Sequence, residues 1–157
     1  LVNGPLSTNP GRRRHKGFVD AMNKFKFKYD DSSIYFAKDF TSSAATDLLN
    51  KNSALQKYDA VICTNDLLAA GVIRHLQEKS LVVGKEISVV GMDNTELCTL
   101  LNPSLTSVDL GAEKRGQLAA ELLLERIKNP TSPHRKIEVQ PELVIRESTD
   151  PKNGASR

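Results

Sequence analysis

The sequence predicts an α/β fold in which a parallel sheet is sandwiched between two layers of helices. Short β-prone runs alternate along the chain with longer segments whose apolar residues recur at helical spacing. The run at 58–63 is almost continuously apolar, as is typical of a strand buried on both faces of a parallel sheet. Regular alternation of this kind favours parallel strands joined by returning helices. A chain of 157 residues is long enough to bury a hydrophobic core around such a sheet.

The predicted strands share a composition rich in Val, Ile, Tyr, Phe and Thr, and Gly, Pro, Asn or Asp residues lie close to their ends. The first of them runs directly into a loop that contains Gly and Pro. In chain order we expect strands within residues 1–5, 32–37, 58–63, 87–91, 105–108 and 137–145.

The predicted helices carry apolar residues three and four positions apart, and two of them follow residues that suit a helix N-cap. The first contains Phe18, Met22 and Phe25 at this spacing. In chain order the helices start after Gly11, at 41–43, at 65–66 and at 112, and the last one reaches about residue 128. Residues 150–157 have the composition of a disordered terminal tail.

Composition excludes several classes of protein. Lys and Arg number 22 against 19 for Asp and Glu, and a net charge of +3 is too small to argue for a nucleic-acid coat. The two cysteines, Cys63 and Cys98, form no Cys-x-x-Cys motif, so the sequence favours a reducing, cytoplasmic location. The apolar runs are shorter than the roughly 20 residues of a membrane span, so we expect no membrane contact. The chain begins with Leu1 and reads as a fragment of a longer protein.

Polar side chains follow several of the predicted strands. In α/β folds ligands bind at the carboxyl ends of the strands, where loops and helix N-termini converge. Arg14 would reach this edge from the first helix, Asn65 follows the third strand, and Asp93 follows the fourth. Together they offer the donors and acceptors that vicinal hydroxyls of a sugar need, and Phe40 could stack on the apolar face of a ring. The alternative roles are a simple helix N-cap for Asn65 and ordinary rim packing for Phe40.

The sequence offers no support for catalysis. The histidines His15, His75 and His134 are scattered, and neither a phosphate-binding glycine loop nor a nucleophile motif is present. We therefore expect that the protein is not an enzyme and binds neither a cofactor nor a metal.

Five stretches of the chain form a recognisable pattern. They are Arg14-x-x-Gly17-Phe18-x-x-Ala21, the run from Ala60 to Gly71, the run from Ile87 to Asp93, the run from Asn102 to Val108, and the run from Pro141 to Thr149. Together these stretches resemble the LacI/GalR family of bacterial transcription regulators. Sugar-binding proteins of bacterial transport systems share the fold and the first three stretches, so they remain the alternative. The last two stretches look more like the regulators.

This resemblance implies that residues 1–149 are the C-terminal part of a two-lobed, periplasmic-binding-protein-like effector domain. Residues 1–109 and about 137–149 would form its C-terminal lobe, whereas the helix at about 111–128 would belong to an N-terminal lobe that this chain lacks. The lobes of such regulators close over a small-molecule effector, which is a sugar, a sugar phosphate or a purine. Operator DNA would be bound only through a helix-turn-helix domain that is also absent from this chain.

The resemblance also implies roles for individual residues. Arg14, Asn65 and Asp93 match the ligand-binding Arg, Asn and Asp of the family, and Phe40 matches an aromatic residue that packs on the ligand. Leu110 stands where many members have a glutamine that reaches the ligand, which leaves the effector open.

A homodimer is the implied assembly. The residues that match the dimer interface of the family are Ala69, Ala70, Ile73, Leu97, Leu100 and Leu101. The helix at 112–128 carries a further apolar stripe, and we expect it to dock on another chain or on the sheet of this chain. Its members are Leu118, Ala119, Leu122, Leu123 and Ile127.

Overall fold

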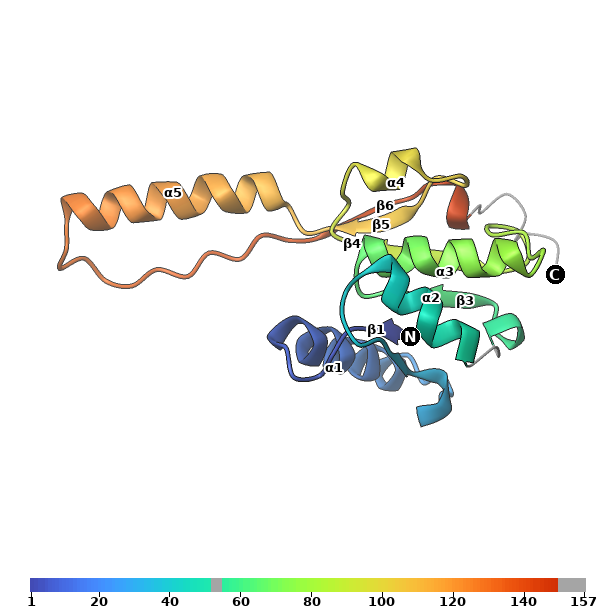
Figure 1. Ribbon diagram of the computed structural model, residues 1–157. Coiled ribbons are helices and arrows are strands. Elements are labelled where there is room, and N and C mark those ends of the chain that lie inside the picture. Colours follow the sequence, from blue (N-terminus) through green and yellow to red (C-terminus); the bar gives the residue numbers. More distant parts are fainter. Residues whose placement is uncertain (52–54, 150–157) are drawn as a thin grey trace.

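A computed structural model describes residues 1–51 and 55–149 of the chain (Figure 1). Strands and helices alternate as the sequence predicts, so the α/β class is confirmed. The strands are β1 (Val2–Asn3), β2 (Tyr35–Phe36), β3 (Ala60–Ile62), β4 (Ser88–Met92), β5 (Thr106–Asp109) and β6 (Glu142–Val144). The α-helices are α1 (Asn9–Lys24), α2 (Ser42–Lys51), α3 (Asp66–Glu78), α4 (Leu97–Leu100) and α5 (Ala112–Lys128).

The strands form two adjoining sheets. β1 pairs with β2, and β3, β4 and β5 pair in that order, with all of these neighbours parallel. A bridge between Val2 and Cys63 joins the two sheets, and the Thr64 N–H donates to the Val2 carbonyl at 3.0 Å. β6 pairs with β5 in the antiparallel direction, because the chain leaves β5 along α5 and returns in the opposite sense.

The core lies between the sheet and the pair α2 and α3, which cover one face together (Figure 1). Val61 and Val89 are buried on that face, and Leu68 and Leu76 of α3 are fully buried. Alternate strand residues point the other way because side chains in a strand alternate between faces. Of these, Ile62 and Leu143 are 41% and 56% exposed. The second helical layer consists of α1, which lies beside β1 and does not extend over β6.

α5 and the extended segment 129–141 form an arm that projects from the body of the molecule (Figure 1). No residue of α5 is buried, and Leu123, Leu124 and Ile127 are each more than half exposed. The arm does not lie on the sheet of this chain, which was one of the two docking places expected for it. Docking on another chain stays a prediction.

Two further expectations concern the C-terminal tail and contact with a membrane. The tail predicted at 150–157 lies outside the described residues. Within residues 1–51 and 55–149, no helix has the length and apolarity that spanning a membrane requires.

Candidate functional site

Arg14 of α1 joins the loops that follow β3 and β4. Its Nη2 lies 2.8 Å from Asp93 Oδ1, and its Nη1 donates to the carbonyl of Thr64. The Arg14 and Asp93 side chains are 19% and 36% exposed, so the ion pair is partly shielded from water. Two of the predicted site residues, far apart in the sequence, therefore meet at the carboxyl edge of the sheet.

The start of α1 explains why Arg14 points at this edge. Thr8 caps the helix, since its Oγ1 accepts the Gly11 N–H at 3.1 Å and donates to the Pro5 carbonyl at 2.8 Å. A Cβ at position 11 would lie 2.1 Å from the Pro5 carbonyl oxygen, so glycine is required there. The buried Asn3 of β1 donates from Nδ2 to the Gly11 carbonyl at 2.9 Å, which ties the helix to the sheet.

Asp93 has a backbone conformation that L-residues seldom adopt. Its φ is 110°, and φ of the next residue, Asn94, is 49°. The Asp93 N–H donates to the Val108 carbonyl at 2.9 Å, which anchors the loop to β5. Non-glycine residues in such conformations concentrate at binding sites, where the surrounding structure holds them.

Partial burial raises the pKa of the Asp93 carboxyl, although the nearby Arg14 guanidinium opposes this shift. Desolvation therefore outweighs the stabilisation that Arg14 supplies to the charged form. Within the described part of the chain, Arg14 is the hydrogen-bond partner of the Asp93 carboxylate through Oδ1, and Oδ2 has none. A ligand hydroxyl or N–H that donates to Oδ2 would satisfy it.

Asn65 and Phe40 lie next to this pair and are connected to each other. The Asn65 Oδ1 accepts the Leu68 N–H at 2.9 Å and caps α3, while its Nδ2 donates to the Phe40 carbonyl at 3.0 Å. The Phe40 ring packs on the loop at Gly4, where an added Cβ would lie 2.3 Å from the ring. Both residues thus perform the alternative roles of cap and rim packing, and their contact with a ligand stays a prediction.

A groove of about 480 Å³ lies between the start of α1 and the base of the arm. Leu110 lines it together with the basic side chains Arg13, Arg115 and Lys136. The charge of Arg115 adds a small opposing effect to the burial that raises the pKa of Asp93, so this groove and the Arg14–Asp93 pair interact electrostatically. Leu110 gives the groove an apolar wall where a glutamine would have supplied a polar one.

Sequence reasoning did not predict the hydrogen bonds that Asp66 makes beneath the site. Asp66, which is 2% exposed, accepts hydrogen bonds from the Thr95 N–H, the Thr95 hydroxyl and the Ser107 hydroxyl at 2.6–2.9 Å. Its position directly after Asn65 at the start of α3 was the available signal. These bonds hold the loops after β3 and β4 together.

The six residues predicted at a dimer interface divide between the core and the surface. Ala69 and Ile73 are 0% and 2% exposed and pack inside this chain, so their side chains do not reach the surface. Ala70, Leu97 and Leu101 are half-buried, and Leu100 is 73% exposed. An interface in this region would therefore be centred on Leu100.

Reactive groups are sparse at the site. Burial raises the pKa of Cys63 to about 12 and that of Cys98 to about 11, so both thiols stay protonated at neutral pH. Among the residues that the structure describes, no cluster of three or more His, Cys, Asp or Glu side chains could hold a metal ion. The geometry suits recognition of a polar molecule through Arg14 and Asp93.

Comparison with known proteins shows the family to which the chain belongs. The sequence pattern of the periplasmic binding protein-like domain matches residues 2–149. The chain belongs to this family. It is 36% identical over 151 residues to the HTH-type transcriptional repressor PurR of Proteus mirabilis, and the match covers 94% of this chain but 43% of the repressor.

Solved structures place this periplasmic binding protein-like domain among the LacI-type regulators, which confirms the predicted resemblance. The regulator CelR in complex with cellobiose matches with a TM-score of 0.84 and 26% identity, over 94% of this chain and 45% of CelR. The lac repressor dimer bound to operator and the anti-inducer ONPF matches with a TM-score of 0.81 and 26% identity, over 96% of this chain and 44% of that one. The relatives are regulators rather than enzymes, and the chain spans less than half of their length.

Proposed function

We propose that this chain is the C-terminal part of the effector-binding domain of a cytoplasmic LacI-type transcription regulator. It would bind a small polar effector, namely a sugar, a sugar phosphate or a purine, and binding would control the affinity of a homodimer for operator DNA. Operator DNA would be contacted by a helix-turn-helix domain outside this chain. The repressor names of the curated relatives favour this function over that of a transport receptor with the same fold.

The observation that carries the proposal is the Arg14–Asp93 pair at the carboxyl edge of the sheet. Arg14 offers a planar donor group, and Asp93 Oδ2 has no hydrogen-bond partner among the described residues, so together they suit a ligand that both donates and accepts hydrogen bonds. Phe40 and Asn65 lie beside them and would add an apolar face and a further amide.

The proposed mechanism is a population shift. The effector would bridge this half of the site to a second lobe and stabilise the closed arrangement of the two lobes. Residues 1–109 and 137–149 would move as the C-terminal lobe, while α5 would move with the other lobe. The effector changes operator affinity only by the difference between its affinities for the two arrangements of the dimer.

The first prediction tests the role of Asp93 in the complete regulator that contains this chain. Isothermal titration with cellobiose, ribose, glucose 6-phosphate and hypoxanthine identifies which probe binds. We expect Asp93→Asn to weaken that binding by at least tenfold, because a neutral amide pairs with Arg14 and with a ligand donor less strongly than a carboxylate does.

The matched control is Asp47→Asn, since Asp47 lies on α2, is 60% exposed and pairs only loosely with Lys38 at 3.5 Å. Operator binding by both variants should equal that of the unmodified regulator in a gel-shift assay without effector. Unchanged affinity of Asp93→Asn for the bound probe would contradict the proposed site.

A further inference from the structure

Asn94, the residue after Asp93, makes hydrogen bonds within the protein through both polar atoms of its side chain and through its backbone N–H. Its Nδ2 donates to Asp109 Oδ2 at 2.9 Å, and its Oδ1 accepts from Arg146 Nη2 at 2.8 Å. Its N–H donates to the Ser107 hydroxyl at 3.1 Å. The Asp93–Asn94 dipeptide, in which both residues have positive φ, is thereby held by β5 and by Arg146, which follows β6.

Asp109 connects this group to the start of the arm. Its Oδ1 accepts the Gly111 N–H at 2.6 Å, and Gly111, with φ of 65°, is the residue from which α5 begins. The hydrogen bonds from Asn94 and Gly111 lower the pKa of the Asp109 carboxyl, so it is charged at neutral pH. One carboxylate thus contacts both the Asp93 loop and the crossover into α5.

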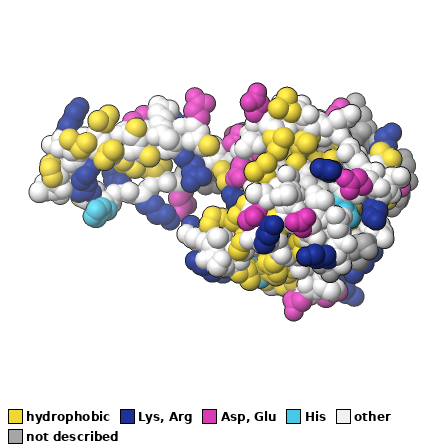
Figure 2. Space-filling view, in the orientation of Figure 1, with side chains coloured by type: hydrophobic (Ala, Val, Ile, Leu, Met, Phe, Trp, Pro, Cys, Tyr) yellow, Lys and Arg dark blue, Asp and Glu magenta, His cyan; other side chains and the backbone are white. Residues whose placement is uncertain are grey.

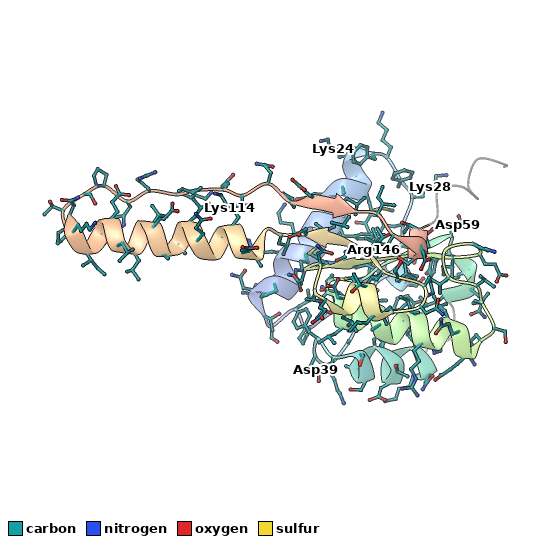
Figure 3. All side chains as sticks on the ribbon, turned by 90° about the horizontal axis from the view of Figure 1, so that it is seen from above. Lys24, Lys28, Asp39, Asp59, Lys114 and Arg146 are labelled. Atoms are coloured by element: carbon teal, nitrogen blue, oxygen red, sulfur yellow. The ribbon has the colours of Figure 1, made fainter. Side chains whose placement is uncertain are left out.

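Arg146 provides the fixed end of the arrangement. Its Nη1 donates to the Leu105 carbonyl at 2.8 Å, while its Nη2 reaches Asn94. Figure 3 shows Arg146 within the compact body of the molecule, well away from the arm that carries Lys114. The Asn94 amide therefore lies between a guanidinium anchored in the body and a carboxylate at the base of the arm.

We propose that Asn94 is a positioning residue, which orients Asp93 toward Arg14 and ties that orientation to the crossover at Asp109 and Gly111. In this arrangement, a rotation of α5 about Gly111 displaces Asp109. The hydrogen bond between Asp109 and Asn94 transmits this displacement to Asn94 and changes the orientation of the neighbouring Asp93. The role of Asp93 as effector carboxylate rests on the proposed function. The link from Asn94 to the Arg14–Asp93 pair does not rest on the proposed function, because this link is present without effector.

The experiment exchanges the two hydrogen-bonding partners. In Asn94→Asp two carboxylates face each other, and neither can donate the hydrogen bond. In Asp109→Asn two amides face each other, and the charged acceptor of this bond is lost. The double variant N94D/D109N restores the pattern, since the residue at 94 accepts from Arg146 and from the new amide at 109, whose oxygen still accepts the Gly111 N–H. Such a cycle isolates the interaction between the two positions.

The readout is the guanidinium resonance of Arg14 in ligand-free chain, measured by NMR, with Asp93→Asn as the reference for the unpaired state. We expect both single variants to move toward this reference and the double variant to return to the unmodified spectrum. Asn94→Asp adds a negative charge, whereas Asp109→Asn removes one. If both variants weaken the pairing of Arg14 with Asp93, the change in local charge is therefore not the cause.

A further variant without a change of charge is needed if Asn94→Asp or Asp109→Asn unfolds the chain. Asn94→Gly removes the amide while keeping a residue that accepts positive φ. The positioning role requires a shift of the Arg14 resonance toward the unpaired reference. A lower thermal midpoint with an unmoved Arg14 resonance would show that Asn94 has a structural role only and would overturn the proposal. Failure of the proposed function appears separately, as effector binding that Asp93→Asn leaves unchanged.

Discussion

Single residues decide the chemistry of the site through their burial and their partners. Arg14 and Asp93 come from different strand–helix units and meet because parallel strands bring their carboxyl ends to one edge of the sheet. Asn65 and Phe40 lie at the same edge but already have partners within the chain. In the proposed function, recognition of the effector therefore depends most on the Arg14–Asp93 pair.

His75 is a buried residue whose protonation is linked to the stability of the fold. It is 2% exposed on α3, and its Nδ1 lies 3.2 Å from Asn50 Oδ1. Burial lowers the pKa of His75, and Lys79 lowers it further. The unfolded chain therefore binds a proton at His75 at a higher pH than the folded chain does.

We predict from this sign that the folded state loses stability as the pH falls through the ordinary histidine range near 6.5. The loss cannot exceed about 1.4 kcal/mol per pH unit for one proton. Chemical denaturation at pH 7.5 and pH 5.5 should show a larger drop in unfolding free energy for the unmodified chain than for His75→Gln. His15 and His134 are present in both chains, so their contribution to the drop is the same. Equal drops in the unfolding free energy would therefore contradict the prediction.

At the scale of elements, α2 and α3 pack so closely that one glycine limits their separation. An added Cβ at Gly71 would lie 2.3 Å from the Ser42 carbonyl oxygen and 2.8 Å from the Ala45 Cβ. Leu49 of α2 and Leu76 of α3 are buried fully beside this crossing. The contact positions α3, and with it the Asn65 cap at the edge of the site.

Gly71→Ala should therefore destabilise the chain by about 1–3 kcal/mol, because overpacking exceeds the gain in helix propensity. Gly17→Ala is the matched control, since nothing lies within 4 Å of an added Cβ at this position of α1. The control should stabilise the chain by about 0.5–1 kcal/mol. Urea denaturation of both variants measures these differences, and a Gly71→Ala chain as stable as the control would refute the packing argument.

At the scale of the whole molecule, apolar side chains are exposed in several parts of the described structure, among them the arm and β6. Figure 2 shows hydrophobic side chains along the arm, where Leu123 and Ile127 are 61% and 64% exposed. The face of β6 that carries Leu143 is also open to solvent. Burying one large apolar side chain contributes about 1.5–3 kcal/mol, so the isolated chain has a strong tendency to cover these surfaces by association.

We predict that sedimentation of the isolated chain shows association that increases with concentration. Replacing Leu123 and Ile127 by Glu should shift the chain toward the monomer, because it removes the apolar surface of the arm. Lys114→Glu, a charge change on the same helix, should leave association unchanged. Leu100→Glu tests the surface near α4 in the same assay. A monomeric chain at all concentrations would count against α5 being a helix that normally docks on another lobe.

Much of this architecture could be predicted from the sequence, because it depends on local patterns. The alternation of apolar strands with amphipathic helices predicted the α/β class. Polar residues directly after strands pointed to Asn65 and Asp93, and the position of Arg14 near the start of the first helix pointed to the same edge, where the structure joins Arg14 to Asp93. The six strands were expected close to where they lie. These predictions needed only the period of the side chains and the rule that parallel strands share one ligand-binding edge.

The tertiary structure decided what depends on distant partners. Arg146 reaches Asn94 only because β6 returns antiparallel beside β5, which no local pattern encodes. The resemblance likewise implied that Ile73 lies at a dimer interface, whereas in the structure its side chain is 2% exposed and belongs to the core of this chain. Periodicity identifies an apolar face, whereas the element that covers it is selected by the free energy of the whole fold.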